Sequence, residues 1–257
     1  MATDQEVRPT SVARRSAFDH QAAMALAATE YGRVLELLEG LAPEQWSTPT
    51  NCPGWDVRAM AGHLLGMAQM VTTVPEMVRQ QVTSGLSARR SGASSLDALT
   101  TYQVERNAPL STDALITAMR EVAPRAVRGR RRAPALVRNA RLPEPQVVGG
   151  RREPWTFGFL FDTILTRDPF MHRLDIAEVT GVAMRADADH EGVLVDDIVR
   201  EWAQRHGQPF RLELSSPAGG TWGDGAGEQI TLDSFEFCRA LAGRRPATGL
   251  LAEQVPF

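Results

Sequence analysis

The stretch that decides the fold and the site reads Arg167-Asp168-Pro169-Phe170-Met171-His172-Arg173-Leu174-Asp175-Ile176-Ala177-Glu178-Val179-Thr180-Gly181. Asp168 and His172 are four residues apart and Asp175 follows three later, so a helix presents all three on one face. Thr180-Gly181 supplies a helix end. A carboxylate and an imidazole one turn apart are two potential metal ligands, and the following aspartate can orient the imidazole or balance charge.

The same residues also fit a plain helix start. Asp168 is then the N-cap, Pro169 occupies the first helical position, and His172 is a core residue with satisfied hydrogen bonds. Taken alone, the stretch leaves both interpretations open.

Composition excludes several classes of protein. The chain has 257 residues and a formal net charge of −3, which gives no general attraction to nucleic acid or to an anionic membrane. All 28 basic residues are arginine, so no lysine can act as a base, a Schiff-base former or a phosphate ligand. Two cysteines exclude a disulfide framework, and we find neither a signal peptide nor an apolar run long enough to span a bilayer. These features predict a cytoplasmic protein.

A second motif lies about a hundred residues upstream. Asp56 is a plausible N-cap after Trp55, which can pack as a hydrophobic staple. The apolar positions that follow place His63 on the inward face of this helix; they are Val57, Met60, Leu64, Met67 and Val71. Cys52, just before this helix, has no evident neighbouring base, so we interpret it as a small buried hydrophobe.

The two motifs together carry a resemblance. Pro53-Gly54-Trp55 and His63-Leu64, paired with Arg167-Asp168-x-x-x-His172-Arg173-x-Asp175 and a terminal Thr-Gly, resemble the mycothiol-dependent maleylpyruvate isomerase family of actinobacteria, within the DinB-like four-helix-bundle superfamily. The resemblance covers the chain from about residue 18 to 245. It implies a divalent metal, usually zinc, bound between helices by two histidines and one acidic residue.

Matched motif to motif, the resemblance makes His63, Asp168 and His172 the metal ligands, with Asp175 and Arg173 around them. The acidic ligand is Asp where the characterised isomerase has Glu, so it must lie closer to the metal or bind through water. Pro169 removes a helix hydrogen bond and predicts a kink or a restart of the helix beside Asp168.

The predicted fold class is α+β. We expect a flexible tail over residues 1–17, a DinB-like metal-binding four-helix bundle over 18–183, and a small α+β domain over 184–257. Within the bundle we expect helices over 18–41, from 57 to 82 with a kink or an end near Pro75, over 96–105, over 112–122 ended by Pro124, and from 155 onward. We expect a loop over 85–95, and strands only after Gly181, where the periodicity changes from 3.6 to two residues.

A basic run over residues 125–141 is the only feature that suggests nucleic acid. It lacks interleaved aromatic residues and any known DNA-reading motif, so we predict a solvated, mobile segment and no nucleic-acid partner.

The resemblance also implies a function. Three protein ligands leave zinc an open position, and a thiol bound there loses its proton. The prediction is therefore an enzyme that activates a low-molecular-weight thiol, mycothiol by resemblance, to isomerise or conjugate a small electrophile. Two alternatives stay open: a non-catalytic metal- or ligand-binding module, and a metal-assisted hydrolase. The residues identify neither the substrate, nor any catalytic group beyond the metal ligands, nor the oligomeric state.

Overall fold

The computed structural model of this protein describes residues 12–257. The described chain forms two compact units that interleave along the sequence. One unit, here the helical unit, comprises residues 20–133 and 168–185 and holds both histidine motifs. The other, here the mixed unit, contains residues 134–167 and 186–257 with the described part of the N-terminal segment. The domain bounds expected from the sequence, 18–183 and 184–257, stay a prediction, and most of the expected tail lies outside the described residues.

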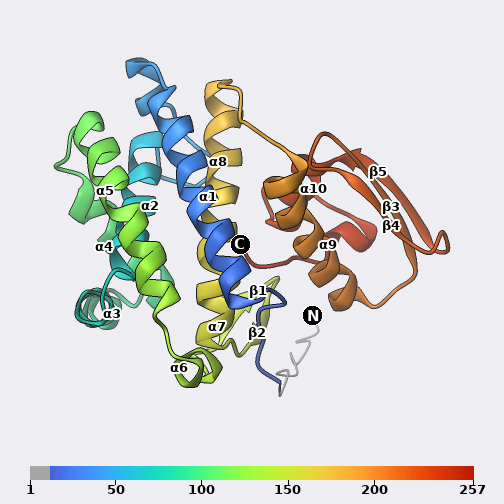
Figure 1. Cartoon of the computed structure of the whole chain (residues 1–257), viewed down its shortest axis with the longest axis horizontal. Helices are drawn as coiled ribbons and strands as arrows, with labels where there is room; N and C mark the ends of the chain where they lie inside the picture. The colour runs from blue at the N-terminus through green and yellow to red at the C-terminus, as the bar shows by residue number, and fades with distance from the viewer. Residues whose placement is uncertain (1–11) are drawn as a thin grey trace, which may run out of the picture. The chain divides into compact units, whose positions relative to one another are not determined.

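The helical unit is a bundle (Figure 1). Its elements are α1 (His20–Glu39), the 3-10 turn η1 (Pro43–Ser47), α2 (Val57–Met70), α3 (Val74–Ser91), α4 (Ser95–Asn107), α5 (Thr112–Arg131) and the part of α8 (Leu165–Thr180) that follows residue 167. Helix α5 packs against both α1 and α2, while α4 packs against α2 and α3. This arrangement confirms the expected bundle.

Local sequence explains where α2 begins and which face it buries. The Asp56 side chain accepts a hydrogen bond from the Ala59 amide at 2.7 Å, which satisfies one amide at the helix start. The apolar stripe expected from the sequence is buried, and His63 is buried with it. The inward orientation predicted for His63 is therefore confirmed.

Helix α8 carries the second motif and continues a longer helical run. It follows α7 (Phe157–Phe159) and one π-helical turn, η2 (Leu160–Ile164), without a break. Pro169 lies inside α8, where its ring would clash with the Leu165 carbonyl in a regular helix. Leu165 has ψ of 10°, far from the usual helical value near −42°, so its carbonyl is tilted away. The widened π turn thus accommodates the proline, and the helix does not restart there.

Two expectations about the chain between the motifs are wrong, and the structure decides a third. Near Pro75 the chain has a helix end and not a kink: α2 stops at Met70, because Thr73 caps a separate helix whose first turn contains Pro75. That helix, α3, runs through most of the loop expected over 85–95 and ends at Gly92, whose φ of 74° is left-handed. Helix α5 passes through Pro124 to Arg131, because its buried stripe continues past the proline.

The mixed unit contains two small sheets. Strands β1 (Gln146–Val148) and β2 (Arg151–Glu153) form an antiparallel hairpin, so the expectation of no strand before Gly181 is wrong. In the second sheet, β3 (Phe210–Ser215) lies between β4 (Gly220–Gly223), which is antiparallel to it, and β5 (Glu228–Asp233), which is parallel. The short helical elements of this unit are α6 (Ala135–Asn139), α7, η2, the π turn η3 (Ala188–Gly192) and the 3-10 turn η4 (Gly249–Ala252).

Two longer helices complete the mixed unit, α9 (Val193–His206) and α10 (Ser234–Leu241). Trp202 of α9 is fully buried against Phe237 of α10 and Phe210 of β3, with ring centroids 5.3 and 4.9 Å apart. The Asp233 side chain caps α10, and Gly207 ends α9 with a φ of 63°. The expected α+β module is confirmed in these elements. Within residues 12–257, the structure contains no helix that is both long and apolar enough to cross a membrane.

Candidate metal centre

Asp168 lies between the two histidines. One carboxylate oxygen, Oδ2, is 3.5 Å from Nε2 of His63, and the other, Oδ1, is 3.6 Å from Nε2 of His172. All three residues offer a donor atom within 4.8 Å of the other two. Two donors that bind one tetrahedral zinc at about 2.0–2.1 Å are about 3.3–3.4 Å apart, so these separations fit a shared cation after small adjustments. The structure thus brings the three predicted ligands together; metal binding itself stays a prediction.

The elements that carry these residues explain their convergence. His63 comes from the buried face of α2, whereas Asp168 and His172 lie one turn apart on α8. Asp168 is inside the continuous helical run and not at a helix start, so the N-cap alternative is wrong. Both histidines are buried, and about a fifth of the Asp168 side chain is exposed.

Asp175 orients His172. Its Oδ2 lies 3.1 Å from Nδ1 of His172, and its side chain is fully buried. A carboxylate on one ring nitrogen fixes the tautomer and leaves the other nitrogen, here the one that faces Asp168, available as a ligand. The sequence predicted that Asp175 lies around the ligands, and this contact with His172 agrees with that position. Its role toward a metal stays a prediction.

Charge around His172 favours a bound cation. Burial alone lowers the pKa of this imidazole, but the Asp168 carboxylate, a hydrogen bond with Asp175 and one with the Cys52 thiol outweigh it and raise the pKa to about 10. Without a metal, the imidazole of His172, which lies between the two carboxylates, is therefore protonated at neutral pH. A dication that displaced this proton would meet the same negative charge.

His63 has unused bonding capacity. Its Nδ1 is buried and makes no hydrogen bond to any other described residue. The imidazole rings of His63 and His172 meet edge to face with centroids 5.3 Å apart. Trp55 lies against both, with its ring centroid 5.1 Å from that of His63 and 6.2 Å from that of His172. Nδ1 lies on the other side of the ring from Nε2, the nitrogen that faces Asp168, so Nε2 is the atom of His63 that can bind a metal.

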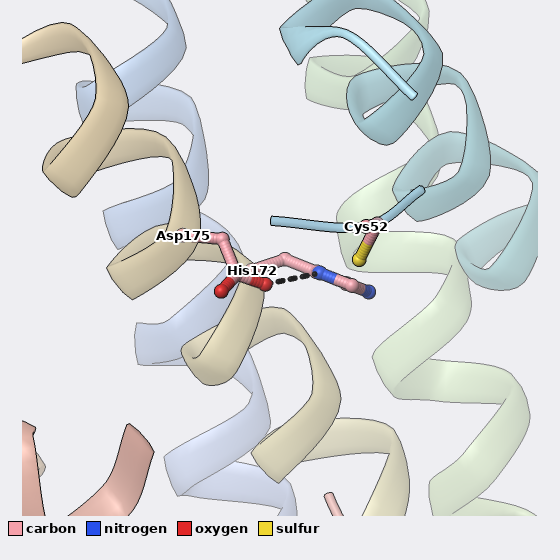
Figure 2. Close-up of side chains that lie close together, drawn as sticks. All are labelled: Cys52, His172 and Asp175. Atoms are coloured by element: carbon pink, nitrogen blue, oxygen red, sulfur yellow. Dashed lines mark hydrogen bonds and ion pairs between the residues drawn. The ribbon is translucent and has the colours of Figure 1, made fainter. Parts of the chain in front are cut away.

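Cys52 is a site residue that the sequence reasoning missed. It is half-exposed, not a buried hydrophobe, and its sulfur lies beside the imidazole of His172, a neighbour that the sequence did not reveal. Donor atoms of Cys52, His172 and Asp175 all lie within 4.8 Å of one another. Figure 2 shows the three side chains together, with Asp175 on one ring nitrogen of His172. The available signal was the position of Cys52 directly before the Pro-Gly-Trp motif.

Arg130 and Tyr31 are also missed neighbours of the site. Arg130, assigned by sequence to a solvated run, is 1% exposed on the inner face of α5. Burial raises the pKa of the Tyr31 phenol on α1, and the nearby Arg130 guanidinium opposes that rise. The charge of Asp168 also acts on this phenol, so Tyr31 lies near the acidic ligand, and Arg130 lies beside Tyr31. Apolar residues continue at helical spacing beyond Pro124, and this pattern was the signal that Arg130 lies on the buried face of α5.

Arg173 binds elsewhere. Its Nε and Nη2 donate to the two carboxylate oxygens of Glu30 on α1 at 2.6 and 2.9 Å, and both side chains are 1% exposed. Nη1 also reaches the Arg185 carbonyl at 3.5 Å. These contacts join α8 to α1; the outer-shell role predicted for Arg173 stays a prediction.

The comparisons with known proteins agree with this geometry. The sequence profile of the mycothiol maleylpyruvate isomerase N-terminal domain matches residues 27–177, more than half of the chain. The chain belongs to the mycothiol maleylpyruvate isomerase N-terminal domain family. All three predicted ligands lie inside the matched range, which confirms the family inferred from the two motifs.

Two curated relatives and two crystal structures are also similar to this chain. Two uncharacterised proteins of Mycobacterium tuberculosis, from strains CDC 1551 / Oshkosh and ATCC 25618 / H37Rv, are each 28% identical over 232 residues, which is 83% of this chain and 82% of theirs. Crystal structures of the mycothiol-dependent maleylpyruvate isomerase and of a histidine-to-alanine mutant superpose with TM-scores of 0.54 and 0.55 at 14% identity. Each superposition covers 89% of this chain and 90% of the isomerase, and it shows the shared fold.

Proposed function

We propose that this family member is a metal-dependent enzyme that activates a low-molecular-weight thiol, mycothiol by its family, to isomerise or conjugate a small electrophile. The observation that carries the proposal is the Asp168 carboxylate placed 3.5 and 3.6 Å from the Nε2 atoms of two buried histidines. Such a set of three ligands with an open position is typical of catalytic zinc sites.

His63, Asp168 and His172 would hold the metal. Bound there, a divalent cation such as zinc supplies the positive charge that makes a coordinated thiol give up its proton. Asp168 offsets part of that charge, so it tunes how acidic the thiol becomes. Asp175 keeps His172 in the tautomer whose Nε2 faces the ligand set.

The surroundings of the ligand set support binding of a small anionic or polar substrate. Trp55 covers the two imidazoles on one side, which limits the access of water. The Tyr31 phenol near Asp168 and the buried Arg130 guanidinium beside that phenol would offer donors for a carboxylate or carbonyl oxygen. For this protein, a cytoplasmic location and the absence of a nucleic-acid partner stay predictions.

The test is thiol-dependent turnover. Zinc-loaded protein with mycothiol is offered a panel of electrophiles that includes maleylpyruvate, and thiol consumption and product are followed. We expect turnover that requires both metal and thiol, is abolished in His172→Ala and is reduced in Asp168→Ala.

Three other outcomes would contradict the proposal. Turnover without thiol would indicate metal-assisted hydrolysis. Ligand binding without product, across the whole panel, would indicate a binding module. Activity unchanged in His172→Ala would remove the metal from the reaction.

A further inference from the structure

Cys52 is held in a short, well-fastened loop before α2. Its amide donates to Thr50 Oγ1 at 3.2 Å and its carbonyl accepts from the Trp55 amide at 3.0 Å. Gly54, with a φ of 81°, closes this turn. The backbone thus places the thiol at a defined point, while its half-exposed position leaves the side chain room to rotate.

The thiol faces ligand atoms and not an apolar core. Its sulfur lies within 4.8 Å of donor atoms of both His172 and Asp175 (Figure 2). His172 is also a member of the group with His63 and Asp168, so the two groups meet at one imidazole. The site therefore has more potential ligands than the three inferred from sequence.

We propose that the Cys52 sulfur is a further protein ligand of the cation held by His63, Asp168 and His172. This inference rests on the proposed function, because it presumes that a cation binds there. The sulfur groups with His172 and Asp175 and not with His63 and Asp168, so the Cys52 side chain must turn toward the Nε2 side of His172 to reach the cation. A thiolate is a soft ligand, so it shifts the preference of the site toward zinc or cobalt and away from magnesium and calcium.

A fourth protein ligand changes how the site works. Three protein ligands leave an open position on zinc, whereas four close it as in structural sites. An added thiol must then compete with Cys52 for the cation. The charges of the Cys52 thiolate and the Asp168 carboxylate together would neutralise a dication, which stabilises a resting protein that holds its metal tightly.

Cobalt spectroscopy tests this proposal directly. The full chain is reduced with a phosphine, kept free of added thiol, stripped of metal and titrated with Co²⁺. Sulfur bonded to Co²⁺ gives a charge-transfer band in the near ultraviolet that nitrogen and oxygen ligands do not give. We expect this band in the wild-type protein and in Cys238→Ala, and its loss in Cys52→Ala and Cys52→Ser.

Cys238 is the matched control because it is fully buried in the mixed unit, where burial raises the pKa of its thiol to about 12. In Cys52→Ala, adding a small thiol should restore the band, since the position is then open. We expect that variant to bind Co²⁺ on the order of 10–100-fold more weakly, as for the loss of other supporting groups at metal sites.

The outcomes separate this inference from the proposed function. Co²⁺ that binds the wild-type protein with no sulfur band, and with the same spectrum as in Cys52→Ala, overturns the role of Cys52 and leaves the three-ligand site standing. No Co²⁺ binding at all overturns both proposals. Far-ultraviolet circular dichroism of each variant shows whether it is folded. Cys52→Ser, which replaces the sulfur by oxygen in a side chain of similar size, repeats the test if Cys52→Ala does not fold.

Discussion

The buried pair of Arg173 and Glu30 allows a quantitative prediction about the bundle. Both side chains are 1% exposed, and two hydrogen bonds of 2.6 and 2.9 Å join them. Arg173→Met removes the two hydrogen bonds that this guanidinium makes to the buried Glu30 carboxylate, and breaking such a buried pair typically costs about 3–5 kcal/mol of unfolding free energy. With a urea m-value of about 2 kcal/mol/M, the midpoint of unfolding should fall by about 1.5–2.5 M. Urea titration of the metal-free protein, followed by circular dichroism, measures this shift.

The control is the double variant Glu30→Leu/Arg173→Met. Replacing both partners by apolar side chains also removes the buried carboxylate charge, so the double variant should recover at least half of the lost stability. A double variant as unstable as Arg173→Met would refute the reasoning, and so would a single variant that loses less than about 1 kcal/mol. The double variant also tests the outer-shell role predicted for Arg173, because a loss of metal affinity on the order of 10–100-fold would support it.

Three further predictions concern packing, pH and nucleic acid. A Cβ on Gly129 of α5 would lie 1.9 Å from the Val71 carbonyl oxygen, so Gly129→Ala should lower the unfolding free energy by about 1–3 kcal/mol in urea titration, whereas Gly32→Ala, with open space, should not. The folded pKa of His172, about 10, lies above its ordinary value of 6.5, so protonation stabilises the metal-free protein fully below pH 6.5 and this contribution is lost as the pH rises toward 10. The difference in unfolding free energy between wild type and His172→Gln should shrink over that range, and a difference independent of pH would contradict the assignment. The basic run over residues 125–141 should give no sub-micromolar, steeply salt-dependent binding to duplex DNA in fluorescence anisotropy.

The part of the candidate site that lies on α8 was predictable because its key relation is local. Asp168, His172 and Asp175 follow helical spacing on one element, so sequence alone placed them on one face. The inward orientation of His63 followed from the apolar positions around it in α2. The α+β module was predictable for the same reason: β3 alternates in burial, and Asp233 and Gly207 mark helix ends.

The errors came where packing outweighs local preference. A proline costs a helix interior about 3 kcal/mol, yet α5 continues past Pro124 because its buried stripe extends to Arg130. The same stripe turns Arg130 from an expected surface charge into a buried neighbour of the site. Strands β1 and β2 have three residues each, too few for a period of two to be recognised. Cys52 lies 120 residues from His172 in sequence, so only the fold could reveal their contact.

Metal content tests the central claim most directly. Protein purified without chelator, or reloaded with zinc and desalted, is analysed for metal per chain by inductively coupled plasma mass spectrometry, for wild type, His63→Ala and His172→Ala. His20→Ala is the control, because His20 lies at the start of α1 and contacts the Arg131 carbonyl. We predict about one divalent ion per wild-type and His20→Ala chain, and loss of that ion in His63→Ala and His172→Ala that remain folded by circular dichroism. Equal metal content in all four proteins, or none in folded wild type after reloading, would contradict the account.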